Sequence, residues 1–278
     1  MEVIGFLFPP FVACAVMIGI FGYLGIHVLE REIVFIDIAL AQVAAVGTVL
    51  VFTMWRIEDT SIIAYFSAFG FTILAAFFYS QIIKRVTQIT QEAIIGVSYA
   101  VSAALALFLL ALAAGGDVHL EHMLTGSILW AKWHDILICT SVYLIVGLFH
   151  YIFRNKFTTL SKDYRRTIEK DSRAAWWDFL FYVSMGLVIT ISVRIGGVLA
   201  IFSFLIIPTT FAAIFTSSWF KRMLLAWLLG ISASIVGLAF SYSMDFSCGP
   251  SVVSFMGLAL IVAAIVKRSR RVAERGKE

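Results

Sequence analysis

Charge is scarce in this chain. Charged side chains make up 14% of its 278 residues, whereas hydrophobic residues make up 61% and the mean hydropathy is +0.97. A soluble domain of this size needs more polar surface than such a composition supplies. The apolar residues also occur in long uninterrupted blocks, which are typical of membrane-spanning helices. We therefore interpret residues 1–278 as a single polytopic, all-α domain in the lipid bilayer. We expect no secretory signal peptide, because the first block lacks a basic start and a convincing cleavage site.

The motifs of several enzyme and channel classes are missing. Without a GxxxxGK[ST] phosphate loop, the chain itself is not expected to hydrolyse ATP by that route. The absence of HExxH, of GxSxG and of an arginine-rich span argues against a zinc protease, a serine hydrolase and a voltage sensor. Cys14, Cys139 and Cys248 show no metal-site spacing and are interpreted as small hydrophobes, or as a helix-end residue for Cys248. Transport is the function class that remains, with no enzymatic activity and no nucleic-acid partner expected.

Nine apolar segments can be drawn, each near the ~20 residues that cross a hydrocarbon core of ~30 Å. The segments are 3–28, 33–54, 60–82, 93–114, 131–153, 176–193, 197–216, 222–243 and 249–266. The sixth and seventh are separated only by "RIGG", and Pro208 lies inside the seventh. Because proline kinks a helix and a broken helix can line a cavity, the sequence predicts a bundle of eight or nine transmembrane helices.

The basic residues predict the orientation in the membrane. Of the 21 lysines and arginines, 18 fall in alternate connections and in the tail, with seven of them between Arg154 and Arg173. The positive-inside rule then places the 154–175 loop and the basic tail, residues 267–278, in the cytoplasm. We expect a multi-pass protein of a bacterial-type plasma membrane with a cytoplasmic C-terminus.

Two polar side chains interrupt the second apolar segment. Asp37 lies about 6 Å and Gln42 about 13 Å along that segment from its predicted inner end, and they are about 140° apart around a helix. Strongly polar groups at such depths face the bundle interior or a water-filled path. Both residues are therefore candidates for a translocation path. The alternatives are that Gln42 holds helices together and that Asp37 is an interfacial acid near the helix start.

Five stretches in order resemble the permease subunits of zinc-, manganese- and iron-type ABC importers. They are "FIDIALAQVAAVG", "TQEAIIGVSYAVSAAL", "EHMLTGSILW", "GGVLAIFSFLIIPTTFAAIF" and "GLAFSYSMDFSCGPSVV". The resemblance runs from about Gly22 to Val266. It implies a homodimeric or heterodimeric pore made with a second permease copy, a cytoplasmic ABC ATPase subunit and an extracytoplasmic metal-binding protein. It also implies a transported divalent metal, zinc, manganese or iron, with no permanently bound cofactor.

One stretch departs from the family pattern. Family members typically carry Asp-x-x-Ser-His where this chain reads "IALAQ". Ile38 stands in place of the acid, Ala41 in place of the serine and Gln42 in place of the histidine, while Asp37 lies one position earlier. A neutral amide is a poor ligand for a transition metal, so the family's usual ligand set is not carried over here.

The loop "DVHLEHM" offers other metal ligands on the predicted outer side. His119 and His122 share a face on a helical turn, and Asp117 and Glu121 stand close to them. Imidazole with carboxylate suits zinc, iron or manganese. The alternative is an exposed loop that contacts no metal or that docks the delivery protein.

The 154–175 loop is longer than a simple turn between helices requires. It predicts an amphipathic helix with Leu160, Tyr164 and Ile168 at i, i+4 and i+8. In an ATP-driven importer such a helix would couple the permease to its ATPase. The alternative is an ordinary basic loop.

The sequence thus predicts the permease subunit of an ABC importer for a divalent transition metal, which works by alternating access. One alternative is an importer of a metal chelate or small cofactor. Another is a membrane protein without a transport role.

Overall fold

The computed structural model describes residues 2–58, 61–85, 88–112, 128–170 and 173–275, and every regular element among them is helical. The elements are α1 (Glu2–Glu30), α2 (Ile36–Trp55), α3 (Ile62–Arg85), α4 (Gln91–Ala111), η1 (Ile128–Trp130), α6 (Trp133–Ile152), α7 (Arg154–Lys162), α8 (Tyr164–Lys170), α9 (Ala174–Phe215), α10 (Trp219–Met244) and α11 (Cys248–Arg275). Eight of these helices are long and apolar enough to cross a membrane. The predicted all-α membrane bundle is therefore confirmed.

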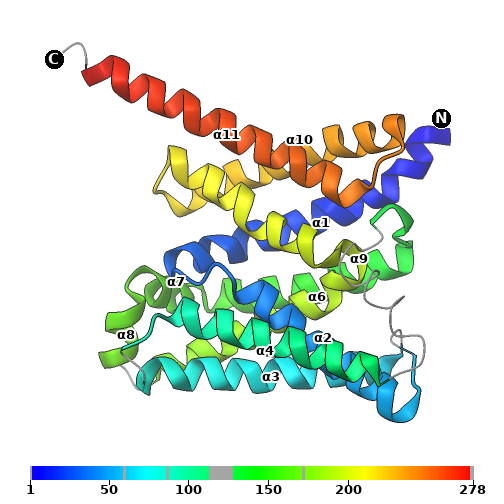
Figure 1. Ribbon diagram of the computed structural model, residues 1–278. Helices are drawn as coiled ribbons and strands as arrows, with labels where there is room; N and C mark the ends of the chain where they lie inside the picture. The colour runs from blue at the N-terminus through cyan, green and yellow to red at the C-terminus, as the bar shows by residue number, and fades with distance from the viewer. Residues whose placement is uncertain (1, 59–60, 86–87, 113–127, 171–172, 276–278) are drawn as a thin grey trace.

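The long helices lie roughly side by side, in groups that meet at α9. In Figure 1 the helices α2, α3 and α4 form one group, α10 and α11 form another, and α1 and α9 lie between them. The short helices α7 and α8 lie at one end of the bundle, together with the far end of α11. We call this the basic end, because three basic residues lie there: Arg31, which bonds Ser161 of α7, Arg222, which bonds Glu30 at the end of α1, and Lys267, which bonds the Ile214 carbonyl near the end of α9.

The 42-residue element α9 is two helical arms that run in opposite directions. Its first arm follows α1 backwards, because Asp178 bonds Arg31 while Gly196 lies against Met17. The second arm returns along α1, where Leu205 lies against Gly25. The arms have 23 and 19 residues, which cover about 34 and 28 Å at the usual helical rise. The two segments predicted on either side of "RIGG" are thus both present, as a hairpin.

The bend depends on Gly197, which has φ 72° and ψ 159°. This backbone conformation is open almost only to glycine, because a Cβ atom would collide with the neighbouring peptide groups. The chain reverses there without a loop. The glycine pair therefore determines where the first arm of α9 ends and where the second begins.

Close helix packing around α2 also follows from a small residue. A Cβ atom at Gly47 would lie 2.8 Å from the Ser67 carbonyl oxygen and 2.9 Å from the Ala68 Cα. The Ser67 hydroxyl donates a 2.7 Å hydrogen bond to the Gly47 carbonyl. Small residues that let backbones approach are typical of helix contacts in membranes. The small side chains of α2 thus bring α3 against it and bury most of the helix.

Candidate translocation path and coupling region

Asp37 lies in the first turn of α2 and is 2% exposed. In the described part of the chain, its Oδ1 atom has no hydrogen-bond partner and no ion pair includes the residue. A buried carboxylate without a partner is costly, so such a group binds a proton or a cation. Carboxylate oxygen also suits manganese and other divalent ions. A role of Asp37 in binding a cation stays a prediction, and its unpartnered Oδ1 atom is consistent with it.

Gln42 is half-buried and lies on a different face of α2 from Asp37. It follows Ile38 by four residues, so these two side chains share a face. Ile38 lines a pocket of about 380 Å³ together with Tyr99 of α4 and Phe202 of the second arm of α9. Gln42 thus stands on the pocket face of α2, next to a largely apolar cavity.

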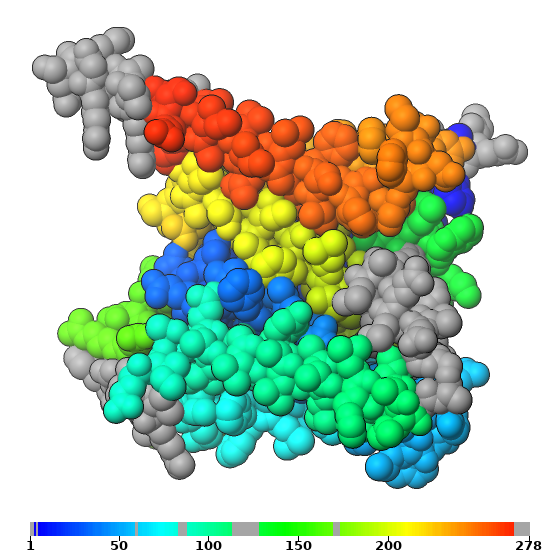
Figure 2. Space-filling model, viewed as in Figure 1, coloured from blue at the N-terminus to red at the C-terminus, as the bar shows by residue number. Residues whose placement is uncertain are grey.

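This pocket opens on the side of the bundle where four helices meet. Its lining comes from α2, α4, the second arm of α9 and the start of α11. In Figure 2 the surface is recessed between α11 above and α4 below, with α9 and α2 lying in the recess. A concave face shared by several helices is the usual place for a path through a helical bundle. Among the described residues, no aspartate, glutamate, histidine, lysine or arginine lines the pocket itself.

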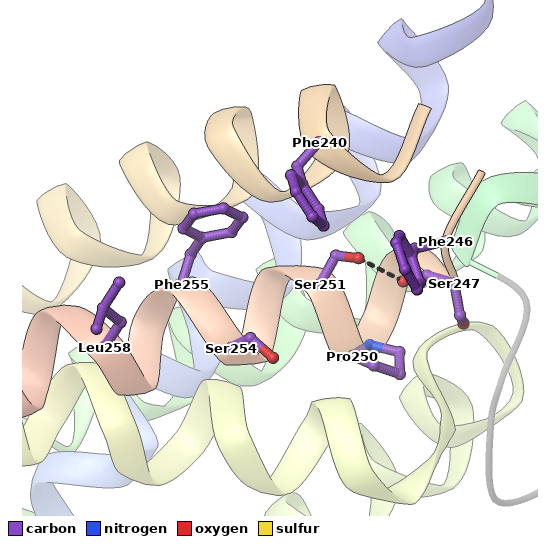
Figure 3. Close-up of a pocket in the computed structure, with 8 residues that line it drawn as sticks. All are labelled: Phe240, Phe246, Ser247, Pro250, Ser251, Ser254, Phe255 and Leu258. Atoms are coloured by element: carbon purple, nitrogen blue, oxygen red, sulfur yellow. Dashed lines mark hydrogen bonds between the residues drawn. The ribbon is translucent and has the colours of Figure 1, made fainter. Parts of the chain in front are cut away.

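A second pocket of about 390 Å³ lies between α10 and α11 and shares Pro250 with the first. Figure 3 shows aromatic rings on one side and serines along α11. The Phe240 ring stacks on Phe246, with ring centroids 5.8 Å apart. The Ser251 hydroxyl donates a 2.8 Å hydrogen bond to the Ser247 carbonyl. The serine hydroxyls and apolar rings offer no strong metal ligand.

The predicted outer ligands Asp117, His119, Glu121 and His122 lie outside the described residues. Within the described residues, no group of three or more His, Cys, Asp and Glu side chains is placed to hold a metal. His134 and Asp135 begin α6 as an exposed helix-end pair, with 3.7 Å between ring nitrogen and carboxylate. The outer metal site therefore stays a prediction from the sequence.

At the basic end, Arg31 joins several helices in one buried cluster. Its Nη1 donates to Asp178 Oδ1 and its Nε donates to the Ser161 hydroxyl, both at 2.8 Å. The Arg31 and Asp178 side chains are both fully buried. The guanidinium also lies over the Phe181 ring, 3.7 Å from its centroid. An ion pair so enclosed is screened little by water, and each partner depends on the other.

Tyr164 and Gln91 complete this cluster. The Tyr164 hydroxyl donates a 2.8 Å hydrogen bond to Asp178 Oδ2, so both carboxylate oxygens are satisfied. Burial raises the pKa of the Tyr164 hydroxyl well above its ordinary value, and the neighbouring Asp178 carboxylate raises it further. Tyr164 therefore stays protonated and keeps donating. Gln91, the first residue of α4, donates to the hydroxyls of Tyr164 and Tyr182. We call Arg31, Asp178, Ser161, Tyr164 and Gln91 the buried node.

The 154–175 loop differs from the single amphipathic helix that its sequence predicts. The helix breaks at Asp163, which has φ −138° and ψ 61°, so α7 and α8 are separate. Leu160, Tyr164 and Ile168 are buried, and they pack on Ala174 and Trp177 of α9. These three side chains anchor the short helices to the bundle and leave the charged residues on the outside. The predicted role of these three residues in coupling to an ATPase stays a prediction, and their burial indicates that they would act as anchors of the short helices.

The buried node was not predicted from the sequence. Arg31 was counted only as one of the basic residues of alternate connections, and Asp178 received no role. The available signal was Asp178 itself, the only acidic or basic residue in the apolar segment 176–193. An acid inside a spanning segment points to a partner or a function. Its partner Arg31 is 147 positions away, and sequence spacing alone does not identify it.

The comparisons with known proteins agree with one another. A family model described as the ABC 3 transport family matches residues 4–267. The manganese import system permease protein ScaB of Streptococcus gordonii is 25% identical over 262 residues, which cover 94% of this chain and 91% of ScaB. A probable metal transport system membrane protein of Chlamydia pneumoniae is 24% identical over 265 residues, covering 94% of this chain and 89% of that protein.

Two solved structures share the fold. PsaBC from Streptococcus pneumoniae, solved in complex with Fab, gives a TM-score of 0.76 at 22% identity. The match covers 93% of this chain and 90% of the PsaBC chain. A protein described as a metal-chelate type ABC transporter, in an inward-facing conformation, gives a TM-score of 0.65 at 17% identity. The match covers 92% of this chain and 83% of that chain. The arrangement of the helices therefore recurs in two solved structures.

Proposed function

The chain belongs to the ABC 3 transport family, and on that premise we propose that it is the permease subunit of an ATP-driven importer of manganese or a similar divalent transition metal. The observation that carries the proposal is the family match over residues 4–267. It is supported by several relatives that are themselves named as manganese or metal transport permeases. Zinc and iron(II) are the other ions to test. The chain is a transport subunit, and ATP hydrolysis belongs to a partner.

We propose three protein partners for the subunit. An ABC ATPase docks at the basic end, which is then the cytoplasmic end and carries the C-terminus. An extracytoplasmic metal-binding protein delivers the ion at the opposite end. A second permease copy covers the recessed face between α4 and α11, because the pocket there is a half-open cavity with several helices around it.

In this mechanism Asp37 and Gln42 serve the ion path. Asp37 supplies an oxygen ligand to the passing cation, and the buried, unpartnered Oδ1 atom supports this role. Gln42 presents a neutral amide on the pocket face, where it orients water or cargo by hydrogen bonds. ATP binding in the partner would bring the basic ends of two permeases together, and the helices around the recess would then open alternately to either side.

The short helices α7 and α8 are the coupling element in this proposal. Their exposed residues include Arg154, Lys156, Lys162, Arg165 and Arg166. Such a surface fits a partner cleft rich in acidic groups or carbonyl oxygens. The buried anchors Leu160, Tyr164 and Ile168 keep the two helices fixed to α9. A displacement of α7 and α8 by the ATPase would therefore also displace α9, because the short helices are packed on it.

A metal chelate is the alternative cargo, and one observation favours it. The described lining of the pocket next to Gln42 holds no acidic or basic side chain, so it suits a neutral or enclosed ligand better than a bare ion. Its volume of about 380 Å³ also exceeds what a single dehydrated ion needs.

The test is uptake into proteoliposomes that hold this subunit with its ATPase and delivery protein. Manganese, zinc and iron(II) are offered singly, with and without ATP, and then as chelates. ATP-dependent accumulation of manganese ahead of the other ions supports the proposal. An active, intact complex that accumulates none of the free ions but takes up a chelate contradicts it and establishes the alternative. A membrane protein without a transport role would show neither uptake nor nucleotide-dependent activity.

A further inference from the structure

We infer that Arg31 is the residue through which the coupling helices move the helices of the ion path, with the buried node as the connection. The inference rests on the proposed importer function and adds to it a specific set of positioning residues. Three structural features carry it: where the node is attached, how it continues into α2, and how it differs from a neighbouring ion pair.

The node is attached to both short helices at once. Ser161 is the next-to-last residue of α7 and accepts a hydrogen bond from Arg31 Nε, while it also lies 2.8 Å from His27 Nδ1. Tyr164 is the first residue of α8 and bonds the Asp178 carboxylate. The break between α7 and α8 at Asp163 thus lies between two residues of the node. Any tilt of either short helix has to move Arg31, Asp178 or both.

From Arg31 the connection to Asp37 is short and rigid. The Ile33 amide donates to the Val28 carbonyl at 3.2 Å, and the Ile36 amide donates to the Ile33 carbonyl at 3.1 Å. Ile33 and Ile36 are both 0% exposed. A hydrogen-bonded link that is held by two buried isoleucines transmits a displacement with little bending, because packed interiors are nearly incompressible. A shift of Arg31 is therefore passed to the first turn of α2.

A second branch of the node reaches α4. Gln91 begins that helix and bonds the hydroxyls of Tyr164 and Tyr182. Further along α4, Tyr99 lines the same pocket as Ile38 of α2. The starts of two pocket helices are thus held by one buried cluster at the basic end.

A second ion pair, formed by the residue next to Arg31 in the sequence, offers a matched comparison with the buried node. Glu30, the last residue of α1, pairs with Arg222 of α10, and Arg222 Nε also donates 2.8 Å to the Thr216 carbonyl at the end of α9. This second ion pair also joins helices at the basic end. It contacts neither α7 nor α8 in the described structure, and it is partly exposed, at 27% and 15%. It offers the same chemistry without the attachment to the coupling helices.

The experiment measures, in the reconstituted complex, how many ions are accumulated for each ATP that is hydrolysed. Ser161→Ala, Asp178→Asn and the control Glu30→Gln are each assembled with the ATPase and delivery protein. The inference predicts that both node variants keep their ATP hydrolysis but lose about tenfold in ions moved per ATP, a usual size for coupling between sites. Glu30→Gln should change that ratio by less than about twofold. Ser161→Ala is the mildest change, so it tests the inference even where Asp178→Asn fails to assemble.

Hydrogen–deuterium exchange measures a second property, the response of the helices to nucleotide, which a purely structural role of the node would leave unchanged. In the wild-type complex, adding an ATP analogue should change exchange in residues 31–40 and at the start of α4. Both node variants should lose that nucleotide-dependent change, while Glu30→Gln keeps it. Node variants that retain wild-type transport per ATP, or an equal loss in Glu30→Gln, would overturn the inference. A wild-type complex that accumulates no ion refutes the proposed cargo, whereas the exchange measurement, which needs no cargo, still tests the node.

Discussion

Two buried aspartates in this chain have opposite surroundings. Asp178 receives hydrogen bonds on both carboxylate oxygens, from Arg31 and from Tyr164, each at 2.8 Å. Asp37 is equally inaccessible, yet its Oδ1 has no partner among the described residues. Both acids lie in helices that span the bundle. Their difference distinguishes a carboxylate that holds a structure together from one that is left available.

The physical consequence differs between the two sites. Removing one member of a buried ion pair leaves the other charge buried without compensation, so a substitution at either residue lowers the stability of the protein. An unpaired buried carboxylate already carries its desolvation cost, and its removal relieves that cost. Asp178 should therefore contribute to stability and coupling. Asp37 should contribute to transport at the expense of stability.

The largest effect is expected at the paired site. Asp178→Ala leaves Arg31 buried without its counter-charge, and the variant should lose about 3–5 kcal/mol of unfolding free energy. Thermal and denaturant unfolding in detergent measure this loss. Glu30→Ala, at the partly exposed pair, should cost only about 1 kcal/mol or less. Equal losses in the two variants would remove the distinction between the node and an ordinary ion pair.

Tyr164→Phe removes one hydrogen bond to the same carboxylate. The expected cost is about 1.5–3 kcal/mol, the usual value for a bond to a charged group. Because burial and Asp178 raise the pKa of Tyr164, the wild-type hydroxyl stays protonated at all pH values below its ordinary pKa of about 10. The cost of the substitution should thus be constant across that range, and the wild-type contribution is lost only as pH rises further. Tyr151→Phe, at an exposed ring of α6, is the control and should change nothing.

Gly197→Ala tests the bend that separates the arm holding Asp178 from the arm lining the pocket. With φ 72° and ψ 159°, a Cβ atom at this position is strained, and we expect a loss of about 1–3 kcal/mol. Gly70→Ala is a matched control, since a Cβ atom there meets nothing within 4 Å. Unfolding curves of both variants check the difference. A stable Gly197→Ala variant would contradict the role given to the bend.

The smallest effect on stability is expected at Gln42. Gln42→Leu should leave unfolding within about 1 kcal/mol of wild type, because the side chain is only half-buried. It should nonetheless impair metal uptake while the complex assembles normally. Size-exclusion chromatography and proteoliposome uptake measure the two properties. Normal uptake would return Gln42 to a role in holding helices together.

The fold was largely predictable from the sequence, because spanning helices need long apolar runs and little else. The predicted segment 33–54 became Ile36–Trp55, and 222–243 became Trp219–Met244. The hairpin in α9 was indicated by the glycine pair of "RIGG", although its backbone geometry was not. The family resemblance identified the same class as the later match over residues 4–267.

The candidate site was less predictable, for a physical reason. Asp37 and Gln42 could be singled out as candidates because polar groups inside an apolar run stand out locally. The buried node was not found, since its members Arg31, Ser161 and Asp178 meet only through tertiary packing. The anchors Leu160, Tyr164 and Ile168 were recognised as one apolar stripe. Which surface that stripe faced depended on α9, and its burial there could not be read from helical periodicity.

The most direct test of the account is manganese uptake by Asp37→Asn, measured in proteoliposomes beside the thermal unfolding of the same variant. The substitution keeps the size of the side chain but removes its charge. The account predicts that uptake falls about tenfold or more, in line with the loss of a charged ligand, while the unfolding midpoint is unchanged or higher. Wild-type uptake combined with a lower unfolding midpoint would contradict it. Asp37 would then be a structural acid like Asp178, and the ion path would have to use other residues.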